Sequence, residues 1–176
     1  NFLNFPILMG IINLTPDSFS DGGKYNNKNS GFNHAKYLIK KGSKILDIGG
    51  ESTRPGANDI NKIIEWKRIN KTLKKLKKLN KFISLDTRKS WIMEQGIKHN
   101  VNLINDVSGL SYDLNTIHIL KKSKIPFVIH HMQGIPKNMQ INPKYKNVLL
   151  DIYDFFENKI KKLKNLGIND KNIILD

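Results

Sequence analysis

The chain has 176 residues, of which 39% are hydrophobic and 26% are charged, a length and composition that indicate one ordinary globular domain. No apolar run approaches the roughly 18 residues that span a bilayer, so we expect no membrane partner. The sequence contains no cysteine, which excludes disulfides and thiolate metal sites and fits a cytoplasmic protein.

The formal net charge is +15, but only three of the 30 basic residues are arginine. Proteins that read DNA bases favour arginine, because its guanidinium group donates two hydrogen bonds to guanine. The joint excess of lysine, asparagine and isoleucine is instead typical of an AT-rich coding genome. We therefore expect a solvated lysine surface and no nucleic-acid partner. The alternative, a basic nucleic-acid binder, predicts binding that weakens steeply with salt.

Short apolar segments alternate with amphipathic segments along the whole chain. Apolar, β-branched runs predict strands over residues 7–12, 44–48, 82–85, 101–104, 126–129 and 172–175. Helical periodicity predicts helices over residues 32–41, 60–79, 90–99, 114–122 and 146–166. Strands that are apolar on both faces are typical of a parallel sheet covered by helices.

The segments that follow the strands are longer than those that follow the helices, and they carry most of the polar groups. This asymmetry is typical of a (β/α)₈ barrel, whose active site lies at the carboxyl ends of its strands. An open doubly wound sheet also binds ligands there, but it usually carries a glycine-rich loop that is absent here. The sequence therefore predicts an α/β fold of the barrel class, incomplete at about five βα units plus a sixth strand.

Two of these segments are rich in groups that bind cations or anions. The first, INLTPDSFSDGG at residues 12–23, offers oxygen ligands that suit a hard cation such as Mg²⁺, although a polar surface loop has a similar composition. The second, GGESTRPGA at residues 49–57, places Thr53 and Arg54 where they can grip an anionic oxygen, and Pro55 stiffens the turn.

The later strand ends each carry a polar side chain. Asp86 follows the third strand, where it either faces the barrel mouth or caps the next helix, and Asn105 and Asp176 follow later strands. His130 and His131 follow the fifth strand, but adjacent residues of a strand face opposite sides, so we expect no shared zinc site. A ring of carboxylates and amides suits a flat, nitrogen-rich heterocycle.

These segments resemble dihydropteroate synthase. MGIINLTPDSFSDGG at 9–23 and LDIGGESTRPGA at 46–57 are similar to its two signature segments. SLDTRK at 84–89, LINDVSGL at 103–110, HMQGIPKNMQ at 131–140 and IILD at 173–176 match its later motifs in order. The resemblance covers essentially the whole chain, so residues 1–176 are expected to form one partial pterin-binding barrel domain.

The resemblance implies a (β/α)₈ barrel that joins 6-hydroxymethyl-7,8-dihydropterin diphosphate to 4-aminobenzoate and releases diphosphate. It implies that Asp86, Asn105 and Asp176 are the catalytic, pterin-reading residues and that Asn13 is a ligand of Mg²⁺. It also implies a set of substrate-binding residues, which are Phe19, Asp21, Thr53, Arg54, Pro55, Val107 and Met132.

The family continues beyond the position of Asp176 with two further strands that carry substrate-binding lysine, arginine and histidine. We therefore expect residues 1–176 alone to be poorly stable and close to inactive, and we expect a homodimer only of a longer chain. Two alternatives remain open. One is a non-catalytic remnant of the enzyme, and the other is a pterin-binding methyltransferase domain, which needs neither signature segment.

Overall fold

A computed structural model describes residues 6–15, 29–52, 58–134 and 142–176. In these ranges the chain forms one parallel sheet in which consecutive strands are neighbours, in the order β1-β2-β3-β4-β5-β6. The strands are β1 Met9–Asn13, β2 Ile45–Gly49, β3 Phe82–Asp86, β4 Leu103–Asp106, β5 Phe127–Ile129 and β6 Ile173–Leu175. This strand order is that of a barrel wall, and it confirms the predicted strands to within a few residues.

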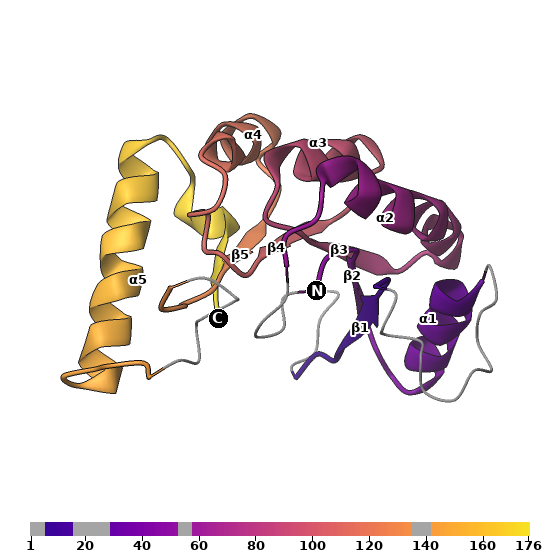
Figure 1. The fold of residues 1–176 in the computed structure, drawn as a ribbon, viewed down its shortest axis with the longest axis horizontal. Helices are drawn as coiled ribbons and strands as arrows, with labels where there is room; N and C mark the ends of the chain where they lie inside the picture. The colour runs from indigo at the N-terminus through magenta and orange to yellow at the C-terminus, as the bar shows by residue number, and fades with distance from the viewer. Residues whose placement is uncertain (1–5, 16–28, 53–57, 135–141) are drawn as a thin grey trace.

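Helices alternate with the strands and lie on the outside of the curved sheet (Figure 1). The α-helices of the described residues are α1 Ser30–Lys40, α2 Lys62–Leu76, α3 Ser90–Lys98, α4 Asn115–Ser123 and α5 Val148–Asn165. Among the described residues, the 3₁₀ helix η2 Lys77–Leu79 follows α2, and the 3₁₀ helix η3 Asp170–Asn172 precedes β6. The predicted helix over residues 60–79 is therefore α2 continued by η2.

The core lies between the outer face of the sheet and the helices. Alternate residues of each strand point to this face. One paired row across β1 to β5 is fully buried and consists of Ile12, Ile48, Leu85, Ile104 and Phe127. Close packing requires small residues at some contacts. A Cβ atom on Gly96 of α3 would lie 2.2 Å from the Leu85 side chain, so glycine lets α3 approach β3.

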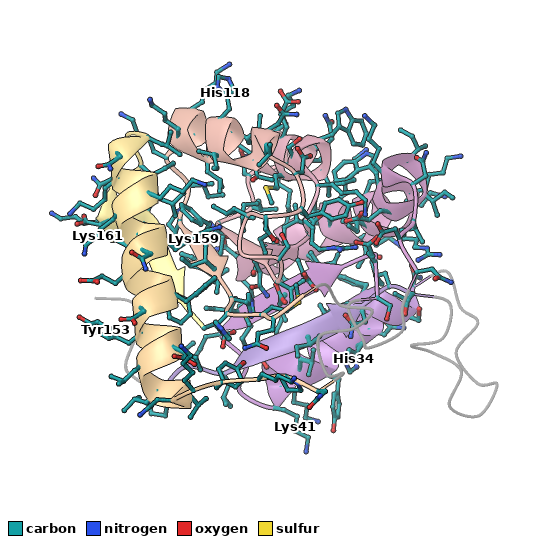
Figure 2. The ribbon with its side chains drawn as sticks, turned by 60° about the vertical axis from the view of Figure 1, so that its left-hand side comes forward. His34, Lys41, His118, Tyr153, Lys159 and Lys161 are labelled. Carbon is teal, nitrogen blue, oxygen red and sulfur yellow. The ribbon has the colours of Figure 1, made fainter. Side chains whose placement is uncertain are left out.

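Asparagine side chains begin the two longest helices. The Asn61 side chain accepts a hydrogen bond from the Ile63 amide at the start of α2. The Asn147 side chain accepts from the Leu149 and Leu150 amides at the start of α5. Such caps satisfy amides that have no partner within the helix. Figure 2 shows Lys159 on the sheet-facing side of α5, with Tyr153 on the opposite side.

The inner face of the sheet is open in the described part of the chain. Met9 and Phe82 both pair with Ile45, so they share this face, and they are 41% and 44% exposed. Ile11, one pair further along β1, is 56% exposed. In a closed barrel such side chains fill the interior. The described residues therefore form an incomplete barrel wall.

None of the helices formed by the described residues is both long enough and apolar enough to cross a membrane.

Candidate functional site

Polar side chains line the inner face at the carboxyl edge of the sheet. Asn13 pairs with Gly49, Gly49 pairs with Asp86, and Asp86 pairs with Asn105, so these residues form one row across β1 to β4. Glycine leaves room for the carboxylate, because a Cβ atom on Gly49 would lie 3.1 Å from Asp86 Oδ2. The register therefore brings together three of the predicted site residues.

Asn105 is held by hydrogen bonds from two sides. Its Nδ2 donates to Asp47 Oδ2 at 3.1 Å, and its Oδ1 lies 2.8 Å from His130 Nε2. His130 Nδ1 lies 3.3 Å from Asp176 Oδ2. These contacts connect four side chains in one polar chain, which runs from Asp47 through Asn105 and His130 to Asp176.

Asp176 extends the pairing of β5 with β6 beyond the last strand residue. Its amide donates to the Ile129 carbonyl at 3.1 Å, and its carbonyl accepts from the His131 amide at 3.0 Å. The side chain itself is 67% exposed. Asp176 therefore meets the site through its backbone pairing with β5 and its side-chain contact with His130.

Burial dominates the electrostatics of the carboxylates here. It raises the pKa of Asp86 well above its ordinary value, and the neighbouring carboxylates Asp47, Glu65 and Asp106 raise it further. Burial also raises the pKa of Asp47. A cluster of carboxylates that resist ionisation together is a common mark of a binding or catalytic site.

The structure decides between the two roles left open for Asp86. Lys89, and not Asp86, is the N-cap residue of α3, and its side chain makes no capping hydrogen bond. The amide of Ser90, the first residue of α3, donates to Asp113 Oδ2 at 2.9 Å. Capping by Asp86 is therefore wrong, and the carboxylate belongs to the polar row.

His130 is a member of the site that the sequence prediction did not assign. The prediction that the two histidines face opposite sides is confirmed. His130 contacts Asn105, whereas the His131 ring packs edge-on against Phe155 at 4.9 Å between centroids. The signal was present in the strand alternation, because His130 is two residues beyond Val128, which pairs with Asn105.

The remaining predicted residues fall into two groups. Val107 and Met132 are both half-buried; Val107 directly follows β4, and Met132 lies three residues beyond the end of β5. The others lie outside the described residues, and they are Phe19, Asp21, Thr53, Arg54 and Pro55.

The described residues contain no group of three or more histidine or acidic side chains placed to hold a metal ion. Asn13, at the end of β1, offers one amide oxygen at the edge of the polar row. Mg²⁺ often takes only one or two protein oxygens and completes its shell with water and substrate phosphates. Asn13 fits that limited role.

The parallel wall, with its polar edge at the carboxyl ends of the strands, defines an α/β protein of the barrel class. The family model described as "Pterin binding enzyme" matches residues 9–176, and the chain belongs to this family.

Relatives and solved structures agree with this assignment. The chain is 42% identical over 177 residues to the dihydropteroate synthase of Neisseria meningitidis serogroup C, covering 99% of this chain and 62% of the relative. A structure of the Yersinia pestis dihydropteroate synthase with a sulfonamide drug superposes with a TM-score of 0.89 at 37% identity, covering 97% of this chain and 62% of that one.

A third match is the Burkholderia cenocepacia dihydropteroate synthase complexed with 7,8-dihydropteroate. Its TM-score is 0.83 at 32% identity, and the alignment covers 99% of this chain and 59% of that one. The chain thus spans about three-fifths of the proteins it matches. The predicted fold class, an incomplete barrel of this family, is confirmed.

Proposed function

We propose that the chain is the pterin-binding part of a dihydropteroate synthase. The reaction joins 6-hydroxymethyl-7,8-dihydropterin diphosphate to 4-aminobenzoate and yields 7,8-dihydropteroate, diphosphate and a proton. The observation that carries the proposal is the polar chain of Asp47, Asn105, His130 and Asp176 beside Asp86, which pairs with Asn105. Its placement at the strand ends and the similarity to dihydropteroate synthases support the same assignment.

Asp86 and Asn105 are the proposed readers of the pterin ring. An ionised carboxylate accepts hydrogen bonds from ring N–H and amino groups, and an amide both donates and accepts. The half-buried Asp86 carboxylate receives no hydrogen bond from another described residue. A pterin that donates N–H groups to it would supply the missing partners and favour its ionised form.

The proposed chemistry requires no protein nucleophile. The bond between the pterin methylene carbon and the diphosphate oxygen breaks, and the amine nitrogen of 4-aminobenzoate bonds to that carbon and loses one proton. Negative charge develops on the leaving diphosphate and positive charge on the pterin. Ionised carboxylates next to the ring, such as Asp86, would stabilise the positive charge.

Mg²⁺ is the proposed metal, held by Asn13 and by the diphosphate of the substrate. When bound, it would neutralise charge on the leaving group. A cytoplasmic location and a homodimer of a longer chain remain predictions, of which the first is supported by the cysteine-free sequence.

Two measurements on the purified chain test the proposal. Binding of 6-hydroxymethyl-7,8-dihydropterin is followed by calorimetry, and turnover is followed by mass detection of dihydropteroate together with released diphosphate. Asp86→Asn should abolish both, whereas Glu94→Gln, which breaks only an exposed ion pair with Lys98, should change neither.

Each alternative has its own outcome. Binding without turnover is the expected result for residues 1–176 alone, and the same result for a chain as long as the matched synthases would identify a non-catalytic pterin-binding remnant. Binding of methyltetrahydrofolate in preference to the dihydropterin would favour a methyltransferase domain. A folded chain that binds no pterin would overturn the proposal.

A further inference from the structure

The residues that follow Asp86 are tied to helix α2 by buried hydrogen bonds. Thr87 Oγ1 donates to Glu65 Oε1 at 2.6 Å, and Lys89 Nζ donates to Glu65 Oε2 at 2.8 Å. Glu65 lies in the first turn of α2 and is 0% exposed, and Thr87 is 2% exposed. The two oxygens of one carboxylate on α2 therefore hold the link between β3 and α3.

Lys89 connects Glu65 to further buried charges. Its Nζ also donates to Glu51 Oε1 at 2.7 Å, and Arg88 donates to Glu51 Oε2 from Nε at 3.1 Å and from Nη2 at 2.8 Å. This ionic cluster consists of Glu51, Glu65, Arg88 and Lys89, all of them buried. Two carboxylates meet two cations, so Glu65 accepts from Thr87 within a cluster of no net formal charge.

The end of β3 is also held from the side of β4. The Thr87 amide donates to the Asn105 carbonyl at 3.0 Å, which extends the pairing of β3 with β4 one residue beyond Asp86. Helix α2 lies close to the strand ends, because a Cβ atom on Gly50 would be 2.8 Å from the Glu65 carbonyl oxygen. Thr87 is therefore bound to β4 through its backbone and to α2 through its side chain.

Asp86 and Thr87 are neighbours at the end of one strand, so their side chains point to opposite faces of the sheet. Asp86 belongs to the polar row of the inner face, and Thr87 points outward, to the side on which the helices lie (Figure 1). The hydrogen bond from Thr87 to Glu65 therefore fixes the rotation of the strand end. Because the Asp86 carboxylate receives no hydrogen bond from another described residue, its direction depends on this backbone placement.

We infer that Glu65 and Thr87 are positioning residues that form an anchor, which points the Asp86 carboxylate at the pterin ring. The inference rests on the proposed function. Neither residue is assigned a contact with substrate, since both are buried on the outer side of the strand ends. The anchor acts through Asp86, so its loss should weaken recognition of the ligand groups that donate to this carboxylate.

A role of the anchor in stability alone makes a different prediction. Loss of a buried hydrogen bond destabilises a fold wherever the bond lies, and a loosened site binds all its ligands less well. A misdirected Asp86 instead reduces the preference for ligands that donate hydrogen bonds to a carboxylate. Selectivity between two ligands therefore separates the two roles.

The test compares 6-hydroxymethyl-7,8-dihydropterin with the analogue that has a carbonyl in place of the 2-amino group. Calorimetry measures both affinities for the wild-type chain and for Thr87→Val. The wild-type chain should prefer the pterin by at least about ten-fold, because a carboxylate accepts from an amino group and repels a carbonyl oxygen. Thr87→Val keeps the branched shape and every charge of the cluster. Its preference should fall by at least about three-fold, because hydrogen bonds weaken steeply with misalignment.

Three further variants guard against a general folding defect. Thr87→Ser keeps the hydroxyl and should retain the preference for the pterin. Thr116→Val is the matched control: it removes the hydroxyl of another fully buried threonine, which donates to the Asp113 carbonyl at 2.7 Å. It should lower the melting temperature about as much as Thr87→Val does and leave the preference unchanged. Glu65→Ala removes the acceptor of the anchor and should reproduce the loss of preference.

The outcomes separate the anchor from the proposed function. If the wild-type chain prefers the pterin and Thr87→Val keeps that preference, the inference is wrong and the proposed function stands. Equal losses of preference in Thr87→Val and Thr116→Val would also overturn the inference, because they would reflect a general loosening. If the wild-type chain binds neither ligand, the proposed function fails, and the role of the anchor in recognition fails with it.

Discussion

His130 Nε2 lies 2.8 Å from Asn105 Oδ1, and this contact orients the amide at the centre of the site. The Asp47 carboxylate accepts a hydrogen bond from Asn105 Nδ2, which identifies the nitrogen end of the amide. The amide oxygen can therefore only accept from His130, which must carry its proton on Nε2. Asp47 and His130 together therefore hold Asn105 in this orientation.

We predict that His130→Ala weakens the affinity for 6-hydroxymethyl-7,8-dihydropterin. The loss of one hydrogen bond costs about 1 kcal/mol, which corresponds to roughly five-fold in the dissociation constant. Calorimetry at pH 7 measures the effect. The neighbouring His131→Ala is the matched control, because that ring packs against Phe155 and does not touch Asn105.

His131→Ala should instead lower the free energy of unfolding by about 1 kcal/mol through the lost aromatic pair and leave the affinity unchanged. Equal affinities for the wild-type chain and His130→Ala would show that Asn105 needs no support from His130.

We predict that Asp86→Asn makes the fold more stable at neutral pH while it removes pterin binding. The folded chain holds the Asp86 proton more tightly than the unfolded chain does, because the pKa is raised from 3.8 on folding. As the pH rises above about 3.8, the unfolded chain loses this proton first, so wild-type stability falls until the raised pKa is passed. Asparagine does not titrate and escapes this loss.

The difference in melting temperature between Asp86→Asn and wild type should therefore grow from pH 4 to pH 8. Each kcal/mol corresponds to roughly 2–4 °C for a chain of this size. The lost charged hydrogen bonds should weaken pterin binding at least about ten-fold. A pH-independent difference would contradict the electrostatic assignment, and unchanged binding would remove Asp86 from the site.

We predict that Gly109→Ala damages both stability and pterin binding. Gly109 has φ +57°, and a Cβ atom there would lie 2.8 Å from the His130 backbone oxygen. The left-handed backbone costs about 1–2 kcal/mol for alanine, and relief of the clash must move His130. Thermal unfolding and calorimetry measure the two effects.

Gly167→Ala provides the comparison, because Gly167 also has a positive φ, +85°, but its neighbour is the flexible end of the Lys121 side chain. It should show a similar loss of stability and unchanged affinity. Similar losses of affinity in both variants would mean that the contact of Gly109 with His130 is irrelevant to binding.

We predict that residues 1–176, produced as such, associate through the inner face of the sheet. Met9, Ile11 and Phe82 expose apolar surface there, and surfaces of this kind drive association. Ile11→Asn should shift the sedimentation profile toward monomer and reduce binding of a hydrophobic dye. The control is Tyr153→Asn, which changes an exposed side chain on the outward side of α5 (Figure 2). Equal effects of the two variants would refute the role of the inner face.

Most of the fold could be predicted from the sequence, since each strand and helix has its own local pattern. The ends were less predictable: the fourth strand was predicted to end at Ile104 and continues to Asp106. Polar residues at a strand end carry no hydrophobic signal, although they still pair with the next strand. The polar ends of the strands predict Asp86 and Asn105 as site residues. The same reasoning considers His130 only as a possible zinc ligand together with His131 and does not assign it to the site.

The sequence alone determined the alternation of strands and helices and the order in which polar residues end the strands, because local periodicity encodes both. The tertiary structure decided which of those residues meet. The register of the parallel pairs places Asn13, Gly49, Asp86 and Asn105 in one row. It also gathers Glu51, Glu65, Arg88 and Lys89 into one buried ionic cluster. Such contacts depend on packing between segments far apart in the chain, which no local pattern specifies.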